Sequence, residues 1–284
     1  MITYKTQTDA DTLETLIECA DTSSDFNDIQ PKQLEPFSEF LIEHAKSNGK
    51  SSTLGTKEQL SNSLARSFNN SCKPLKVALL LSLNQFTITD SFSAQTTIRT
   101  IQASKNNKLD SFLLQQSRSG GAFDIQKIIL SIKSSTYINN CKKPLQEIVI
   151  TFSNGLYFPA ATGIISLYDG LLSHISNNSK TSLRMRLDPI IEQAMSIFLK
   201  NKGSSNPEVV DFLQNHLGVF SFLIANNQFC MTSDFSSKEP SYINRHWLAH
   251  GRYKRDIGEL DCIKLFRLLN GLLLTAELLS FESQ

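Results

Sequence analysis

The sequence predicts an all-α protein built from helical bundles, and three observations support this prediction. Apolar residues recur at helical spacing in successive segments, Ser/Asn-rich breaks and glycines separate these segments, and few stretches alternate as a half-buried strand would. The chain has 284 residues, of which 40% are hydrophobic. It is therefore long enough to bury a sizeable core as one large domain or two ordinary ones.

The first half of the chain contains a series of predicted amphipathic helices. In the first of them Leu13, Leu16, Ile17 and Ala20 recur at i, i+3, i+4 and i+7, which places them on one helix face. Further predicted helices cover residues 33–46, 56–68, 75–83, 94–104 and 123–132. This half carries no motif that indicates a particular chemistry, so its role stays open.

A polar stretch at residues 134–144 predicts a domain boundary. It divides the chain into a helical N-terminal domain, residues 1–142, and a C-terminal helical domain, residues 143–284. Longer helices with broad apolar faces are predicted beyond this boundary at residues 145–152, 160–175, 183–201 and 207–226. Two short helices are predicted to close the chain, one at residues 241–250 and one that begins after Gly258.

The composition excludes several classes of protein. A formal net charge of +1 excludes a strongly basic nucleic-acid coat, so any affinity for RNA has to come from a local patch. The five cysteines lack C-x-x-C spacing, which disfavours a disulfide scaffold and a cysteine zinc site and favours a reducing compartment. We expect no signal peptide and no membrane span, because the apolar runs are too short. The expected location is the cytoplasm.

A local basic patch lies at residues 241–255, Ser-Tyr-Ile-Asn-Arg-His-Trp-Leu-Ala-His-Gly-Arg-Tyr-Lys-Arg. It holds two of the five histidines, the only tryptophan and four cationic residues, with no acidic residue. RNA cleavage without a metal needs a base that takes a proton from a 2′-hydroxyl near neutral pH and a fixed cation beside the phosphate. Imidazoles in general titrate near about 6.5, and a guanidinium stays charged and can bind two phosphate oxygens. The residue types of the patch match these two tasks.

Residues 244–251, Asn-Arg-His-Trp-Leu-Ala-His-Gly, resemble the R-x(4–6)-H motif of the HEPN ribonuclease superfamily and the NRHxxxHG string of its bacterial members. Residues 262–269 are similar to the K-L-F-x-L-L ending of those members. Residues 152–161 and 167–172 are similar to the F-x-x-G-x-Y-x-x-A and D-G-L-L helices that open such domains. The resemblance covers roughly residues 143–284 and nothing before them.

This resemblance implies an all-helical domain, usually a homodimer in which the two motif copies face each other in one cleft. It implies that His250 activates the 2′-hydroxyl, that Arg245 holds the scissile phosphate and stabilises its developing charge, and that His246 orients or assists. The product would be a 2′,3′-cyclic phosphate, and the scheme uses no metal and no cofactor. Further contacts with RNA are expected from Asn244, Arg252, Lys254 and Arg255.

The function that follows from the resemblance is a metal-independent endoribonuclease. Such enzymes act in bacterial antiviral defence, in stress responses or as toxins of toxin–antitoxin systems. An antitoxin or another defence-system protein is therefore an expected partner beside RNA and a second copy of the chain.

Three other interpretations of the same residues stay open. The C-terminal domain could be a non-catalytic HEPN-like module that dimerises or binds a nucleotide or RNA. His246 and His250 have the i, i+4 spacing of metal ligands, although no glutamate follows His246 and no third ligand is obvious. Alternatively, Trp247 and Leu248 are core residues and the charged groups form an ordinary solvated face. In an ideal helix Arg245 and His250 point about 140° apart, so the arginine has to reach round.

Overall fold

The structure is a computed structural model that describes residues 31–35, 38, 42, 56–69, 81–82, 84–87, 94–176, 239–240 and 242–281. All regular secondary structure in these residues is helical, which confirms the predicted all-α class for them. The first predicted helix, which contains Leu13 to Ala20, lies outside the described residues, as do those at 183–201 and 207–226 and most of 33–46 and 75–83. In the described part of the chain, no helix combines the length and hydropathy that crossing a bilayer requires.

The described helices agree with the predicted ones at several places. The predicted segments 56–68, 94–104 and 123–132 correspond to α3, α5 and α7, and 145–152 and 160–175 lie within α8 and α9. The bounds in chain order are η1 (Pro31–Leu34), α3 (Lys57–Asn69), α5 (Ala94–Lys105), α6 (Leu109–Gln116), α7 (Ile125–Ser134), η3 (Thr136–Cys141), α8 (Lys142–Ser153), α9 (Tyr157–Ile175), α13 (Arg245–Ala249) and α14 (Glu259–Phe281).

Helices α6 and α14 differ from the sequence-based expectation. Helix α6 was not predicted, because eight residues give too short an apolar pattern and such a helix is marginal by itself. Its Leu109 and Leu113 are buried, so tertiary packing stabilises it. The last helix, α14, is 23 residues long where a short one was predicted. It continues through Asn270 and Gly271, which disfavour helix, because Leu272 and Leu273 beyond them are buried.

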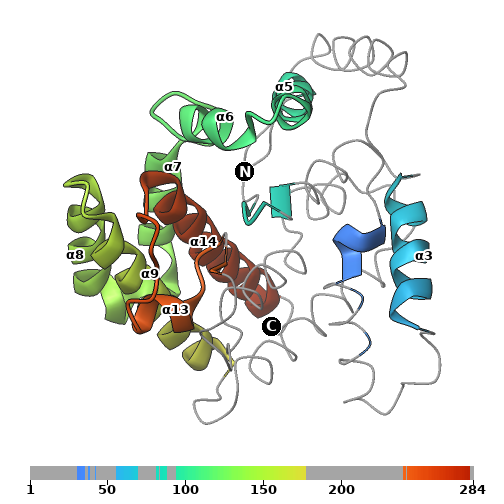
Figure 1. Cartoon of the computed structure of the whole chain (residues 1–284). Coiled ribbons are helices and arrows are strands. Elements are labelled where there is room, and N and C mark those ends of the chain that lie inside the picture. Colours follow the sequence, from blue (N-terminus) through green and yellow to red (C-terminus); the bar gives the residue numbers. More distant parts are fainter. Residues whose placement is uncertain are drawn as a thin grey trace, which may run out of the picture.

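Helix α14 is the centre of the described bundle. It packs along α7 and α9 and also contacts α6, and Figure 1 shows it in dark red beside these helices. A helix that is buried on most sides is apolar around most of its surface. Accordingly, its buried residues include Cys262, Ile263, Leu265, Phe266, Leu268, Leu269, Leu272 and Leu273. Helix α8 packs on α9, and Phe152 of α8 reaches α14 with its ring centroid 5.4 Å from that of Phe266.

A fully buried arginine, Arg267 of α14, joins segments that are far apart in the sequence. Its Nε donates to the carbonyl of Thr87 at 2.7 Å, and its Nη1 donates to the carbonyl of Phe123 at 3.4 Å. The guanidinium also lies 4.7 Å and 5.3 Å from the ring centroids of Phe86 and Phe123. The hydrophobic core therefore contains residues from both sides of position 142. The predicted division into 1–142 and 143–284 stays a prediction.

Candidate functional site

The basic segment forms one short helix, α13, which begins at Arg245 rather than at residue 241. Asn244 is extended and takes the N-cap position, where its Oδ1 accepts the N–H groups of His246 at 3.0 Å and Trp247 at 3.2 Å. Asparagine is among the best N-cap residues because it satisfies N–H groups that have no partner inside the helix. Asn244 is fully buried, so it supports the helix from inside, and its contact with RNA stays a prediction.

Gly251 ends this helix, as the sequence predicts. It has a positive φ of 59°, a backbone conformation that glycine adopts without steric cost. Its N–H donates to the carbonyl of Leu248 at 3.1 Å, and the N–H of Arg252 donates to the carbonyl of Trp247 at 3.0 Å. These two hydrogen bonds satisfy the last carbonyls and turn the chain away from the helix axis immediately after His250.

The inner side of α13 anchors it to the bundle. Trp247 and Leu248 are only 4% and 3% exposed, and α13 packs on α9. The interpretation of these two residues as core is therefore confirmed. Their burial is compatible with a surface site, because Arg245 is exposed and His246 half-buried on the same short helix, and the C-cap residue His250 is exposed.

A tyrosine that follows the motif braces it. The N–H of Asn244 donates to the Oη of Tyr253 at 2.5 Å, and this hydroxyl donates to the carbonyl of Tyr242 at 2.8 Å. Burial raises the pKa of Tyr253 to about 12, so the group stays a neutral phenol that can both accept and donate. Tyr253 thereby fixes the residue that caps α13. This role was not predictable from the sequence, because nothing local indicates where the hydroxyl points.

The two motif histidines contact each other, and the arginine contacts helix α9. The rings of His246 and His250 are in edge-to-face contact, with centroids 4.6 Å apart. Arg245 extends toward α9, where its Nη2 lies 3.5 Å from the Oδ2 of Asp169. The side chain of Arg245 is 48% exposed, and His250 is exposed as well. Neither the guanidinium nor the imidazole is therefore sealed in the interior.

Arg255 binds an acidic residue, Asp261, which lies outside the basic segment. Its Nη1 and Nη2 donate to the two carboxylate oxygens of Asp261 at 2.8 Å and 3.0 Å. This pairing raises the pKa of Arg255. Asp261 also accepts the N–H of Gly258 at 3.0 Å, so the pair fixes the start of α14. The contact of Arg255 with RNA stays a prediction.

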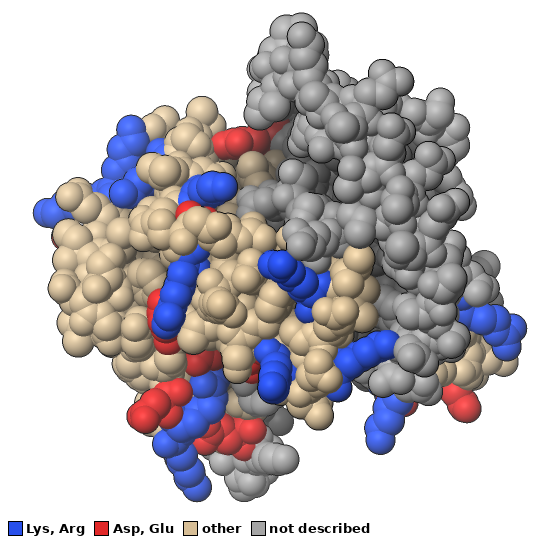
Figure 2. All heavy atoms as spheres, turned by 90° about the horizontal axis from the view of Figure 1, so that it is seen from above, with Lys and Arg blue, Asp and Glu red and all other residues tan. Residues whose placement is uncertain are grey.

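A second acidic residue, Glu239, holds the segment after the motif. Its carboxylate accepts the backbone N–H groups of Lys254 at 3.0 Å and Arg255 at 3.3 Å. Arg252 and Lys254 are exposed. On the face drawn in Figure 2, Lys and Arg occur singly or in small groups, with Asp and Glu beside several of them. This distribution agrees with the small net charge of the chain.

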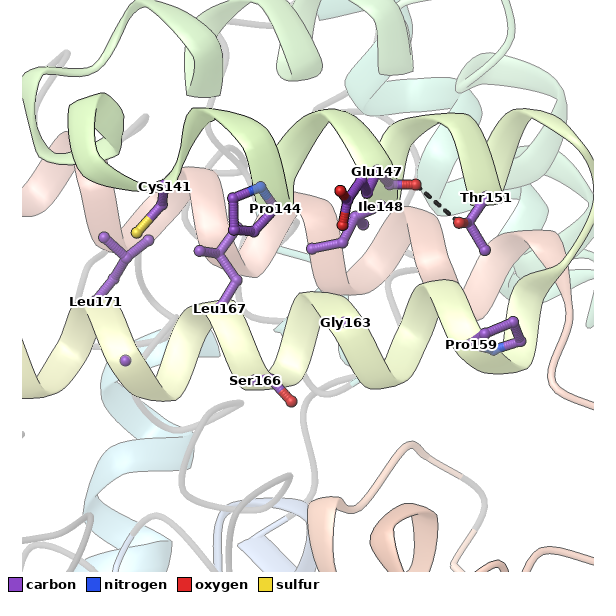
Figure 3. Close-up of a pocket in the computed structure, with 11 residues that line it drawn as sticks. Cys141, Pro144, Glu147, Ile148, Thr151, Pro159, Gly163, Ser166, Leu167 and Leu171 are labelled. Carbon is purple, nitrogen blue, oxygen red and sulfur yellow. Dashed lines mark hydrogen bonds between the residues drawn. The ribbon is translucent and has the colours of Figure 1, made fainter.

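A groove of about 460 Å³ lies on the other side of α9, between that helix and α8 (Figure 3). Its lining residues are Cys141, Pro144, Glu147, Ile148, Thr151, Pro159, Gly163, Ser166, Leu167, Gly170 and Leu171. The predicted site residues are not among them. The groove is thus a feature of the α8–α9 pair rather than of α13.

The metal interpretation would need further ligands beside His246 and His250. Within the residues that the structure describes, no group of three or more His, Cys, Asp or Glu side chains could hold a metal ion. The two histidines are a pair in this part of the chain, and a structural zinc site takes four ligands.

Comparisons of the chain with protein-family models, with curated proteins and with solved structures found no match. The resemblance of residues 143–284 to HEPN ribonucleases therefore stays a prediction from the motif and its flanks.

Proposed function

We propose that this protein is a metal-independent endoribonuclease of the HEPN type. The observation that carries the proposal is the arrangement of α13. Its buried residues, Trp247 and Leu248, fix the helix on α9, while Arg245 and His250 are left accessible to a ligand. The buried side of this short segment thus holds it on the bundle, and its exposed side carries the groups proposed to act on RNA.

The proposed reaction is a transfer within the RNA backbone. His250 accepts the proton of a 2′-hydroxyl, whose oxygen then attacks the adjacent phosphorus and displaces the 5′-oxygen of the next nucleotide. The displaced oxygen takes up a proton, and the products are a 2′,3′-cyclic phosphate and a free 5′-hydroxyl. Arg245 stabilises the phosphate as its charge changes, and His246 orients or assists the base.

The contacts that hold α13 in place support this assignment. Catalytic groups contribute most when packing and hydrogen bonds hold them in a productive geometry. Asn244 caps one end of the helix and Gly251 ends it, while the hydroxyl of Tyr253 accepts the backbone N–H of Asn244. A five-residue helix would not keep its shape without these contacts.

A homodimer is part of the proposal. Within one chain the arginine lies toward α9 while the histidines contact each other. A second copy that faces the first would add another arginine and another histidine pair to the same cleft. Arg252 and Lys254, both exposed, would contact RNA phosphates without regard to sequence, so binding would weaken as salt rises. The proposed setting is a cytoplasmic defence, stress or toxin–antitoxin system.

The test is cleavage of end-labelled single-stranded RNA by the full-length protein in EDTA. We expect cutting by the wild type, a cyclic phosphate on the 5′ product, and no cutting of DNA of the same sequence. Arg245→Ala and His250→Ala should abolish cutting, while His174→Ala, at the exposed end of α9, should not. Undiminished cutting by both motif variants would exclude this site as the source of the activity.

Mixing the two inactive variants tests the dimer. If one cleft takes groups from both copies, mixed dimers of Arg245→Ala and His250→Ala contain one intact arginine and one intact histidine pair. Partial recovery of cleavage on mixing is then expected, together with a dimer mass in solution. Binding of RNA without any cleavage by the wild type would favour a non-catalytic binding module.

A further inference from the structure

Asp169 of α9 faces the motif arginine across the junction of α9 and α13. Its Oδ2 lies 3.5 Å from the Nη2 of Arg245, and its side chain is 25% exposed. Within the described residues this is the acidic group that the structure places against the arginine. An ion pair this open to water contributes little to folding stability, because solvent screens it and two side chains lose freedom. Because folding stability gives little reason for this pair, we consider a role for it in the function of Arg245.

The form of the contact differs from that of the neighbouring structural pair. Arg255 uses both Nη atoms on the carboxylate of Asp261, which leaves little of that guanidinium for another ligand. Arg245 instead reaches Asp169 through one Nη atom. A guanidinium has five N–H donors in a planar fork, so a single contact on one side leaves the others available to phosphate oxygens.

We propose that Asp169 is a positioning residue for Arg245. It holds the guanidinium beside α9 in the free protein and yields part of its contact when an RNA phosphate binds. The proposal rests on the proposed function in one respect, namely that Arg245 binds a phosphate of RNA. It adds a residue that acts on RNA only through the arginine.

This role has opposite effects on binding and on chemistry. The Asp169 charge competes with the phosphate for the same guanidinium, so removing it should tighten binding. The same change frees a long side chain that has to be ordered again at each turnover, so cleavage should slow. A residue that only stabilised the fold would instead weaken binding and slow cleavage together.

The test is a double-mutant cycle on the full-length protein with a 2′-O-methyl RNA, which cannot react. Four proteins are compared: the wild type, Asp169→Asn, Arg245→Ala and the double variant. Asp169→Asn should tighten binding about threefold at low salt, the size expected for an exposed ion pair. In the Arg245→Ala background the same change should have no effect, because the groups act as one unit. The control is Asp110→Asn, which removes one negative charge on α6, where Asp110 pairs with Lys264 of α14. This variant changes the net charge by the same amount and should not alter binding.

The second readout is single-turnover cleavage of the corresponding RNA. Asp169→Asn should cut about tenfold more slowly while it binds more tightly, at an unchanged melting temperature. Equal changes in binding with and without Arg245, or no change at all, would overturn the role of Asp169. If the wild type does not cut RNA, the nuclease proposal fails, and the binding cycle still decides whether Asp169 acts through Arg245.

Discussion

His246 and His250 lie one helical turn apart, with their ring centroids 4.6 Å from each other and their planes at 67°. This edge-to-face contact joins a half-buried imidazole to an exposed one. His250 is the C-cap residue of α13 and has left the regular helix, so its own backbone does not fix the ring. The neighbouring ring of His246 therefore contributes to the orientation of the proposed base.

The contact predicts that the shape of the side chain at 246 matters. His246→Phe keeps an aromatic ring beside His250, whereas His246→Ala removes the contact, which is worth about 0.5–1.5 kcal/mol for aromatic pairs. We expect His246→Ala to lower the RNA cleavage rate more than His246→Phe does, with both variants above His250→Ala. Initial rates in EDTA measure this order. Equal rates for the phenylalanine and alanine variants would contradict the packing role, and if both were well below the wild type they would indicate a role for the imidazole in proton transfer.

The pair formed by Arg255 and Asp261 predicts a change in stability. Arg255→Lys keeps the charge but cannot reproduce the two parallel hydrogen bonds at 2.8 Å and 3.0 Å. We expect it to lower the free energy of unfolding by about 1–2 kcal/mol, since the pair is partly buried. Asp110→Asn breaks an ion pair whose acid is 69% exposed and should change stability by less than about 0.5 kcal/mol. Urea unfolding measures the free energy of unfolding of both variants. If Arg255→Lys lowers it no more than Asp110→Asn does, the Arg255–Asp261 pair does not support α14.

Tyr253 predicts an alkaline loss of stability. The folded protein keeps the phenolic proton up to a pKa of about 12, against an ordinary value of 10.0. Between these values the unfolded chain binds fewer protons, so stability should fall as pH rises from 10 to 12. Tyr253→Phe should flatten this decline, at a cost of about 1–2 kcal/mol at neutral pH for the lost hydrogen bonds.

Part of the alkaline decline should persist in Tyr253→Phe. Burial raises the pKa of the Cys262 thiol from 9.0 to about 12. Ionisation of this thiol therefore also lowers the stability of the protein as pH rises from 9 to 12, a range that overlaps with that of Tyr253. Thermal melting between pH 8 and 12 separates the two, with Cys262→Ala as the second variant. An unchanged profile in Tyr253→Phe would contradict the assigned environment of the phenol.

Two glycines of α9 predict opposite effects of the same substitution. A Cβ at Gly170 would meet no atom within 4 Å, so Gly170→Ala should raise stability by about 0.5–1 kcal/mol through helix propensity. A Cβ at Gly163 would lie 2.7 Å from the Cγ1 of Ile148, so Gly163→Ala should lower stability despite the same gain. Melting temperatures measure both. In an Ile148→Ala background the penalty at Gly163 should disappear, and its persistence there would place the strain elsewhere.

The helices of the described bundle were largely predictable, because burial of one face imposes a period on the sequence. Helices α3, α5 and α7 follow their predicted segments closely. Helix α6 was missed because its eight residues depend on neighbours for stability. The length of α14 was underestimated because Asn270-Gly271 reads as a break, and only the burial of the residues around it keeps the helix continuous.

The candidate site was predictable only in its local part. The spacing of His246 and His250 within one turn, the cap at Asn244 and the stop at Gly251 are all short-range features. One of the open interpretations also placed Trp247 and Leu248 in the core, and their burial confirms this part of it. The acidic partners were not predictable: Asp169, Glu239 and Asp261 reach the cationic segment from other parts of the chain.

By itself, the sequence determined that the described chain is helical and that a cationic, histidine-bearing segment forms a short helix that stops at Gly251. These properties depend on side-chain period and on hydrogen bonds between near neighbours. Only the tertiary structure decided which arginine keeps N–H donors that a ligand can reach. Arg255 is taken up by Asp261 at the start of α14, while Arg245 meets Asp169 through a single contact at the surface. The physical reason is that charge acts through space, so the counterion of each arginine depends on how distant segments pack.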